Sequence, residues 1–139
     1  MATVNVTLSL SSTDLFAKQN ISFTESDILT PAGAQQLVGK LEVPASGKSN
    51  IALAALAGTN DLAYVFLHNL SSTADEYVKV GLCAAHGTDS DTGDWFAVLG
   101  PGEFMFAPIG SSTGFQDIDL ESNGSATPSV EYVLMEKAA

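Results

Sequence analysis

The stretch VNVTLSL, residues Val4 to Leu10, decides the fold class of this chain. Apolar and polar side chains alternate along it, which is the period of a β-strand that buries one face. Further short apolar segments follow, each bounded by Gly, Pro, Ser, Thr, Asn or Asp, the residues that favour turns. The predicted strands are 4–10, 21–24, 37–43, 51–57, 63–69, 77–84, 95–99, 103–108, 115–120 and 130–136. This spacing predicts an all-β fold, an antiparallel β-sandwich that is jelly-roll-like.

One segment leaves helix and strand as alternatives. Thr30 and Pro31, followed by residues 32–38, are compatible with one or two helical turns, since proline suits a first turn. A strand that begins near Gln36 competes with this interpretation. With 139 residues, no repeat and no linker, the chain is predicted to be a single β-sandwich domain, 1–139. Residues 1–60 are expected either to extend the sandwich or to contact a partner.

The charge balance excludes two classes of partner. Sixteen acidic residues stand against five lysines and no arginine, which gives a net charge of −11. Phosphate groups are bound through clustered Lys and Arg, so this chain is repelled by nucleic acid and by anionic lipid. The longest apolar run, 51–57, is far shorter than the ~20 residues of a membrane span. The sequence therefore predicts neither a nucleic-acid partner nor a membrane partner, and its N-terminus shows no secretory signal.

The residues that usually carry catalysis are scarce. Cys83 is the single cysteine and is flanked by apolar residues, so it is predicted to be a small buried side chain. His68 and His86 are too few to build a histidine-ligated metal site of the cupin type. No nucleophile elbow, phosphate loop or dinucleotide fingerprint occurs. The sequence predicts a protein that is not an enzyme, with no catalytic, cofactor-binding or metal-binding residues.

One acidic loop keeps a second interpretation open. Asp89, Asp91 and Asp94 lie within the segment 87–94, between two predicted strands. Their oxygens are the ligands that Ca²⁺ prefers, but the spacing departs from an EF-hand loop. Asp, Ser and Gly also serve turn geometry in a solvated loop. Whether this loop binds Ca²⁺ is left open.

Two neighbouring segments are apolar on both faces. Residues 95–99 and 103–109 together hold Trp95, three phenylalanines, a methionine and an isoleucine, around what is predicted to be one hairpin. Phe104 and Phe106 are expected to share a face, with Met105 and Ala107 opposite. A strand that is apolar on both sides is either buried on both or takes part in a subunit contact. The pattern predicts self-association.

The C-terminal half resembles small virion proteins of tailed bacteriophages. The segments that carry the resemblance are AYVFLHNLSS (63–72), YVKVGL (77–82), FAVLGPGEF (96–104) and VEYVLMEK (130–137). The likeness covers 63–137, and the family meant is phage structural β-sandwich proteins, chiefly head decoration (cement) proteins and related fibre or tail components.

This resemblance implies a structural function. It implies a subunit, expected to be a homotrimer, that binds the major capsid protein on the outer surface of a virion assembled in the host cytoplasm, and stabilises the shell. It carries over no catalytic residue. Two alternatives stay open: a fibre or tail-associated module that recognises a host glycan or receptor, and a polysaccharide hydrolase. Exposed aromatic side chains with polar neighbours favour the first of these, and two facing carboxylates in a cleft favour the second.

Overall fold

The computed structural model describes residues 3–16, 19–29, 31–52, 62–83, 95–110 and 117–137, which form antiparallel β-strands and no helix. The strands are β1 (Val4–Phe16), β2 (Gln19–Leu29), β3 (Pro31–Glu42), β4 (Lys48–Ala52), β5 (Leu62–Asn69), β6 (Val78–Cys83), β7 (Trp95–Leu99), β8 (Phe104–Gly110), β9 (Asp117–Ser122) and β10 (Ser129–Lys137).

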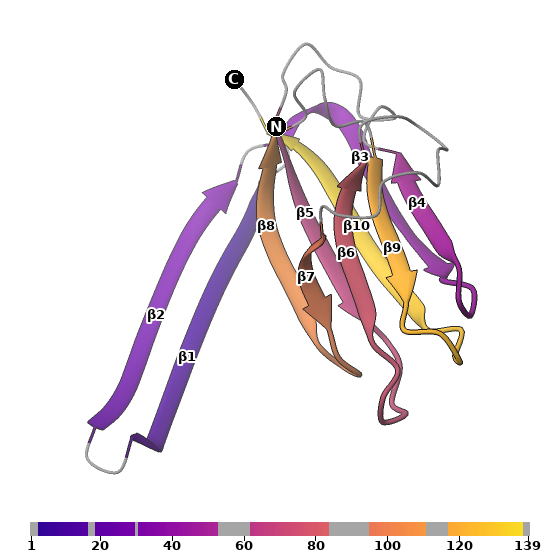
Figure 1. The fold of residues 1–139 in the computed structure, drawn as a ribbon. Helices are drawn as coiled ribbons and strands as arrows, with labels where there is room; N and C mark the ends of the chain where they lie inside the picture. The colour runs from indigo at the N-terminus through magenta and orange to yellow at the C-terminus, as the bar shows by residue number, and fades with distance from the viewer. Residues whose placement is uncertain are drawn as a thin grey trace.

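Eight of these strands form a jelly roll. One four-stranded sheet has the order β3-β10-β5-β8, and the other has the order β4-β9-β6-β7 (Figure 1). All pairs are antiparallel, and strands far apart in the sequence are neighbours, as when β10 lies between β3 and β5. This wrapping of eight strands into two packed sheets is the jelly-roll arrangement, so the predicted fold class is confirmed.

The hydrophobic core lies between the two sheets. Alternate residues of each strand point inward, so Val65 and Leu67 of β5 are fully buried while Tyr64 and Phe66 are not. The core cluster comprises Val43, Ile51, Ala63, Val65, Leu67, Val78, Val80, Leu99, Ile109, Ile118, Leu120, Val130 and Leu134. These side chains come from both sheets, and their burial is what holds the sheets together.

A buried asparagine fastens the sheets at one end of the sandwich. Asn69 is fully buried at the end of β5, and its Nδ2 donates to the carbonyl oxygens of Glu76 (2.8 Å), Leu99 (3.2 Å) and Gly100 (3.1 Å). The carbonyl of Asn69 accepts from the backbone N–H of Gly102, 3.0 Å away. Because β5 and β7 belong to different sheets, this side chain joins them where no strand ladder can.

The two remaining strands form a separate ribbon. β1 and β2 pair only with each other, from Val4 opposite Leu29 to Phe16 opposite Gln19. Figure 1 shows this ribbon leaving the sandwich beside β8 and projecting away from it. Of the segment predicted to be an extension or a contact part, residues 31–52 therefore supply two sandwich strands, and residues 4–16 and 19–29 form the ribbon.

Three predictions are corrected in detail. Residues 31–38 form a strand that starts at Pro31, earlier than Gln36, and not a helical turn. β7 and β8 pair with β6 and β5, so 100–102 connects the two sheets and does not close a hairpin. Pattern alone missed this because pairing is decided by tertiary packing. The stretch 4–10 is a strand, but it is half-buried only near its start, since Leu8 and Leu10 are 47% and 53% exposed.

Candidate functional site

The outer surface of the β3-β10-β5-β8 sheet is a candidate interaction surface. We call it the aromatic face, and it consists of Val38, Tyr64, Phe66, His68, Phe104, Phe106 and Val133. The register places Val38, Val133, Phe66 and Phe106 side by side in one row across the four strands. Val38 is 64% exposed, Phe104 61% and Phe106 36%, so large apolar side chains meet solvent here.

Ring contacts hold the aromatic face in one arrangement. Tyr64 and Phe106 stack with centroids 5.8 Å apart and planes within 5°, and Phe66 lies 6.1 Å from Phe104. His68 meets the edge of Phe104 at 6.5 Å. Cross-strand aromatic pairs each contribute roughly 0.2–1 kcal/mol. The face is thus preorganised, which lowers the entropy that a binding partner would have to remove.

The ribbon has one apolar and one hydroxyl-rich surface. Leu8 lies opposite Glu25 and Leu10 opposite Phe23, so these side chains share one surface together with Val4 and Val6. The other surface carries the pairs Thr7–Ser26, with hydroxyl oxygens 3.2 Å apart, and Ser9–Thr24, at 3.4 Å. Leu10 is 53% exposed and Phe23 43% exposed. The apolar surface of the ribbon is therefore largely uncovered along its outer half.

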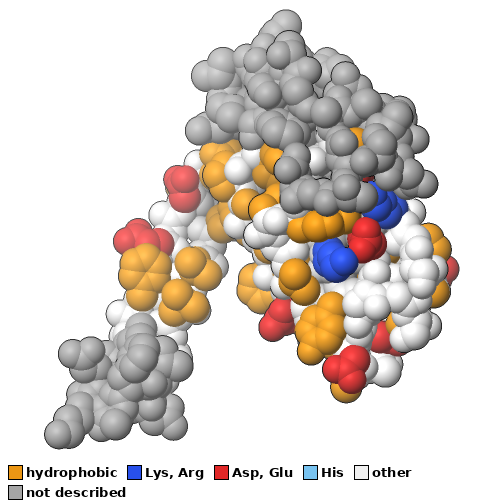
Figure 2. Space-filling model, viewed as in Figure 1, with side chains coloured by type: hydrophobic (Ala, Val, Ile, Leu, Met, Phe, Trp, Pro, Cys, Tyr) orange, Lys and Arg blue, Asp and Glu red, His pale blue; other side chains and the backbone are white. Residues whose placement is uncertain are grey.

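The base of the ribbon and the aromatic face line a common groove. This groove has a volume of about 640 Å³, and the side chains that line it are mostly apolar. One wall is Val4 to Leu8, and the opposite wall is Phe66, Phe104, Met105, Phe106, Val133 and Met135. In Figure 2 the ribbon stands apart from the sandwich, with hydrophobic side chains on both. The groove reaches β10, but none of the described side chains of β3, residues 37–42, lines it.

Few charged groups accompany the aromatic face. His68 Nδ1 lies 3.8 Å from a carboxylate oxygen of Glu131, and Lys40 occupies the same row on β3. Among the described residues, no ion pair or ring contact involves Lys40. Lys40 thus lies opposite Glu131 at the β3 side of the aromatic face and forms no ion pair with a described residue.

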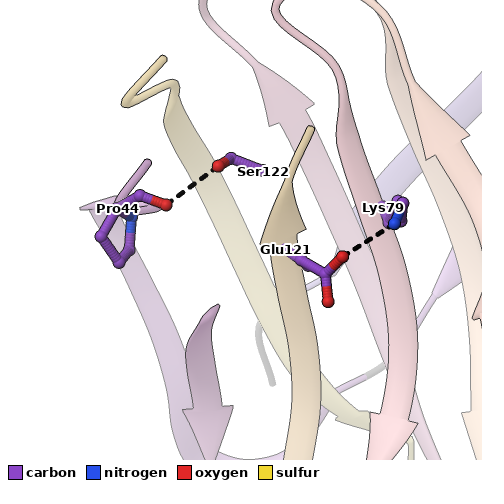
Figure 3. Close-up of polar contacts among 4 residues, drawn as sticks. All are labelled: Pro44, Lys79, Glu121 and Ser122. Carbon is purple, nitrogen blue, oxygen red and sulfur yellow. Dashed lines mark hydrogen bonds and ion pairs between the residues drawn. The ribbon is translucent and has the colours of Figure 1, made fainter. Parts of the chain in front are cut away.

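The other sheet carries a smaller apolar patch and an ion pair. Phe96 and Val98 of the edge strand β7 are 49% and 57% exposed, and we call them the β7 patch. On the same sheet Lys79 Nζ lies 2.7 Å from Glu121 Oε1 (Figure 3). The same Nζ lies 5.8 Å from the centre of the Trp95 ring. The ion pair is partly exposed, so it contributes little to stability.

A polar contact at the C-terminal end of β9 joins this strand to the turn after β3. Ser122 Oγ donates to the carbonyl of Pro44 at 2.9 Å (Figure 3). The turn itself is closed by the Gly47 N–H, which donates to the same carbonyl at 3.0 Å. A small polar pocket lies beside Lys79. It is lined by Ser46 of this turn and by residues 121–124, which are the end of β9 and the start of the turn that follows it. These groups serve to hold loops in place, since their polar atoms already bond within the chain.

The residues that sequence analysis considered for chemistry are not gathered in one place. His68 lies in the aromatic face, whereas His86 and the loop of Asp89, Asp91 and Asp94 lie outside the described residues. Cys83 is buried, as predicted. Within the described part of the chain, no three His, Cys, Asp or Glu side chains are placed to hold a metal ion, and no helix is long and apolar enough to cross a membrane.

Sequence analysis missed two features. Asp117 and Asp119 of β9 are buried, at 0% and 3% exposure, although an alternating strand usually exposes its acids. The contribution of β3 to the aromatic face was also missed. A usable signal was present in β5, where Tyr64, Phe66 and His68 alternate with residues that are themselves apolar, so both faces of that strand are apolar or aromatic.

Comparisons with known proteins identify no relative of this chain, so the function has to be inferred from the surfaces described above. No protein-family model matches the chain, and no curated protein or solved structure matches it either.

Proposed function

We propose that this chain is a non-enzymatic structural protein of a phage virion, which binds the assembled capsid shell from outside and stabilises it as a decoration protein. The observation that carries the proposal is the pair of exposed apolar surfaces on opposite sheets of one rigid sandwich, the aromatic face and the β7 patch. Soluble monomers rarely leave such surfaces uncovered, so each fits a contact with another protein.

Two separate surfaces suit a subunit that contacts two kinds of neighbour at once. A decoration protein has to bind the major capsid protein and, in a homotrimer, its own copies. The aromatic face together with the ribbon is the larger surface and fits self-association, and the β7 patch fits the shell. Apolar burial contributes about 25 cal/mol per Å² before the cost of association, so many copies on one particle add up to substantial reinforcement.

The charge supports a position on the outside of the particle. A net charge of −11 repels packaged DNA, so a contact with the interior of a filled shell is unfavourable. The exposed groups of the β7 patch are uncharged, so shell binding through this patch does not depend on neutralising that charge.

The test is binding to purified capsids. The full chain is mixed with phage particles from its own source, sedimented, and the bound copies are counted by quantitative mass spectrometry and located by cryo-electron microscopy. We expect hundreds of ordered copies per particle. The double variant Phe96→Ser/Val98→Ser should lose binding, and Ile28→Ser, more exposed but on the ribbon, should retain it. A handful of copies at the tail, or none, would overturn the proposal.

A second candidate function is recognition of a host glycan or receptor by a fibre or tail component. The aromatic face favours it, because Tyr64 and Phe66 lie in one face with the polar groups of His68 and Glu131. Apolar ring faces stack on sugars, and polar neighbours bond to the hydroxyl groups. Glycan-array binding that is lost in Phe66→Ser and kept in Val98→Ser would select this function over shell binding.

A further inference from the structure

The ribbon has more apolar surface than its own sandwich covers. Val4 and Val6 are half-buried in the groove, but the wall that the ribbon contributes ends at Leu8. Beyond it Leu10 and Phe23, which lie opposite each other, are 53% and 43% exposed. A two-stranded hairpin is at best marginally stable alone in water. The outer half of the ribbon therefore needs a second apolar surface to pack against.

The aromatic face has an exposed apolar area at its β3 side that the ribbon of the same chain does not cover. The ribbon of the same chain lies beside β8, at one edge of the sheet, whereas Val38 and Lys40 lie on β3, at the other edge (Figure 1). Val38 is the most exposed apolar residue of that face, at 64%. None of residues 37–42, the part of β3 whose side chains the structure describes, lines the groove, so Val38 is left uncovered by the chain's own ribbon.

The charges on the two surfaces indicate which surface packs on the β3 side of the aromatic face. With a net charge of −11, copies of the chain repel one another, so a close contact has to bring acids to a cation. The apolar surface of the ribbon carries Glu25 opposite Leu8 and Asp27 opposite Val6. Lys48 and Lys79 are at Trp95 on the other sheet, whereas Lys40 borders the aromatic face on β3, opposite Glu131 in the register and in no ion pair with a described residue. The negative charges of Glu25 and Asp27 on the ribbon are therefore complementary to the positive charge of Lys40.

We propose that the ribbon of one copy packs on the β3 side of the aromatic face of a second copy, with Leu10 and Phe23 against Val38 and with Glu25 beside Lys40. Because donor and acceptor are different surfaces, the contact is head-to-tail, and such a contact forms a ring where the rotation between copies closes and a filament where it does not. The proposed assembly is the closed ring, which has a fixed number of copies. This inference deepens the self-association in the proposed function and rests on that part of it. It does not depend on the capsid.

The first test measures the size of the purified full chain by light scattering during size-exclusion chromatography, with no particles present. We expect a discrete oligomer. The double variant Leu10→Ser/Phe23→Ser should become monomeric, while Ile28→Ser, which is 67% exposed on the opposite surface of the ribbon, should stay assembled. On the acceptor side Val38→Ser should become monomeric and Val98→Ser should not. Circular dichroism checks that each variant keeps its β-structure.

A charge exchange then tests the orientation. Lys40→Glu and Glu25→Lys should each raise the dissociation constant about tenfold, and the two combined should restore it, because one desolvated charge pair contributes on this order. A mixture of the Leu10→Ser/Phe23→Ser and Val38→Ser proteins should form a dimer through its one intact contact.

A chain that stays monomeric at the highest soluble concentration overturns the inference, as does an oligomer that survives both sets of variants or a double charge variant that is not restored. Failure here with normal capsid binding would leave shell decoration standing. Normal assembly of the purified chain without capsid binding would support this inference and would overturn the proposed binding to the capsid shell.

Discussion

Strand β1 of the ribbon and strand β5 of the sandwich each carry aliphatic side chains at every second position, and these two faces have opposite fates. Val65 and Leu67 of β5 are completely buried, while Leu8 and Leu10 of β1 are about half exposed. The difference is the presence of a second sheet over one face of β5, which the ribbon lacks within this chain. Alternation thus specifies that a strand has an apolar face and says nothing of what covers it.

The largest expected difference between the core and the ribbon comes from shortening one leucine in each region. Leu120→Ala, in the core, should lower the free energy of unfolding by about 2–5 kcal/mol, because it removes buried methyl groups and leaves a cavity. Leu10→Ala should change it by less than about 0.5 kcal/mol, since the side chain is already in solvent. Urea denaturation of dilute protein measures both. Equal effects would mean that the ribbon is part of the cooperative core.

An asparagine pair sharpens the comparison for polar side chains. Asn69→Ala removes the donor to three carbonyl oxygens at the joint between the sheets and should cost about 1–3 kcal/mol. Asn5→Ala, on the exposed ribbon, should be close to neutral. The readout is the midpoint of urea unfolding. A neutral Asn69→Ala would contradict the role of this side chain in closing the sandwich.

The connection between the sheets gives a smaller effect. Gly102 has a φ of +72°, and a Cβ added there would meet no atom within 4 Å. Gly102→Ala should therefore cost only the backbone strain of a left-handed residue, about 1–2 kcal/mol. Thermal unfolding measures the loss, and Ser125→Ala in the loop before β10 serves as a neutral control. An unchanged melting temperature would argue against the left-handed conformation.

The smallest effect belongs to the hydroxyl-rich surface of the ribbon. Thr7→Ala removes the contact with Ser26 and should destabilise the ribbon by about 0.2–1 kcal/mol. Because the ribbon is outside the cooperative core, we expect faster amide hydrogen exchange in β1 and β2 with unchanged global unfolding. Mass spectrometry after deuterium labelling resolves the two regions. Faster exchange in β5 or β10 as well would show that the regions are coupled.

The sequence supported the fold class better than it supported the surface. Period-two segments between turn residues were sufficient for a jelly-roll-like sandwich, because each strand of such a fold has one face toward the core and one toward solvent. The pairing of β7 with β6, instead of with β8, depends on contacts between residues far apart in the chain, such as those of Asn69, which no local pattern contains. The row of Val38, Val133, Phe66 and Phe106 draws one residue from each of four strands, so it becomes visible only when the register is known.

The central place of β10 has a consequence for how the protein is made. β10 pairs with β3 on one side and with β5 on the other, although β3 and β5 are synthesised well before it. Until residues 129–137 leave the ribosome, the nascent chain presents two unpaired strand edges above an open core. A neighbouring nascent chain could insert its own β10 into that slot. Strand exchange through β10 is thus the misfolding route that this topology favours.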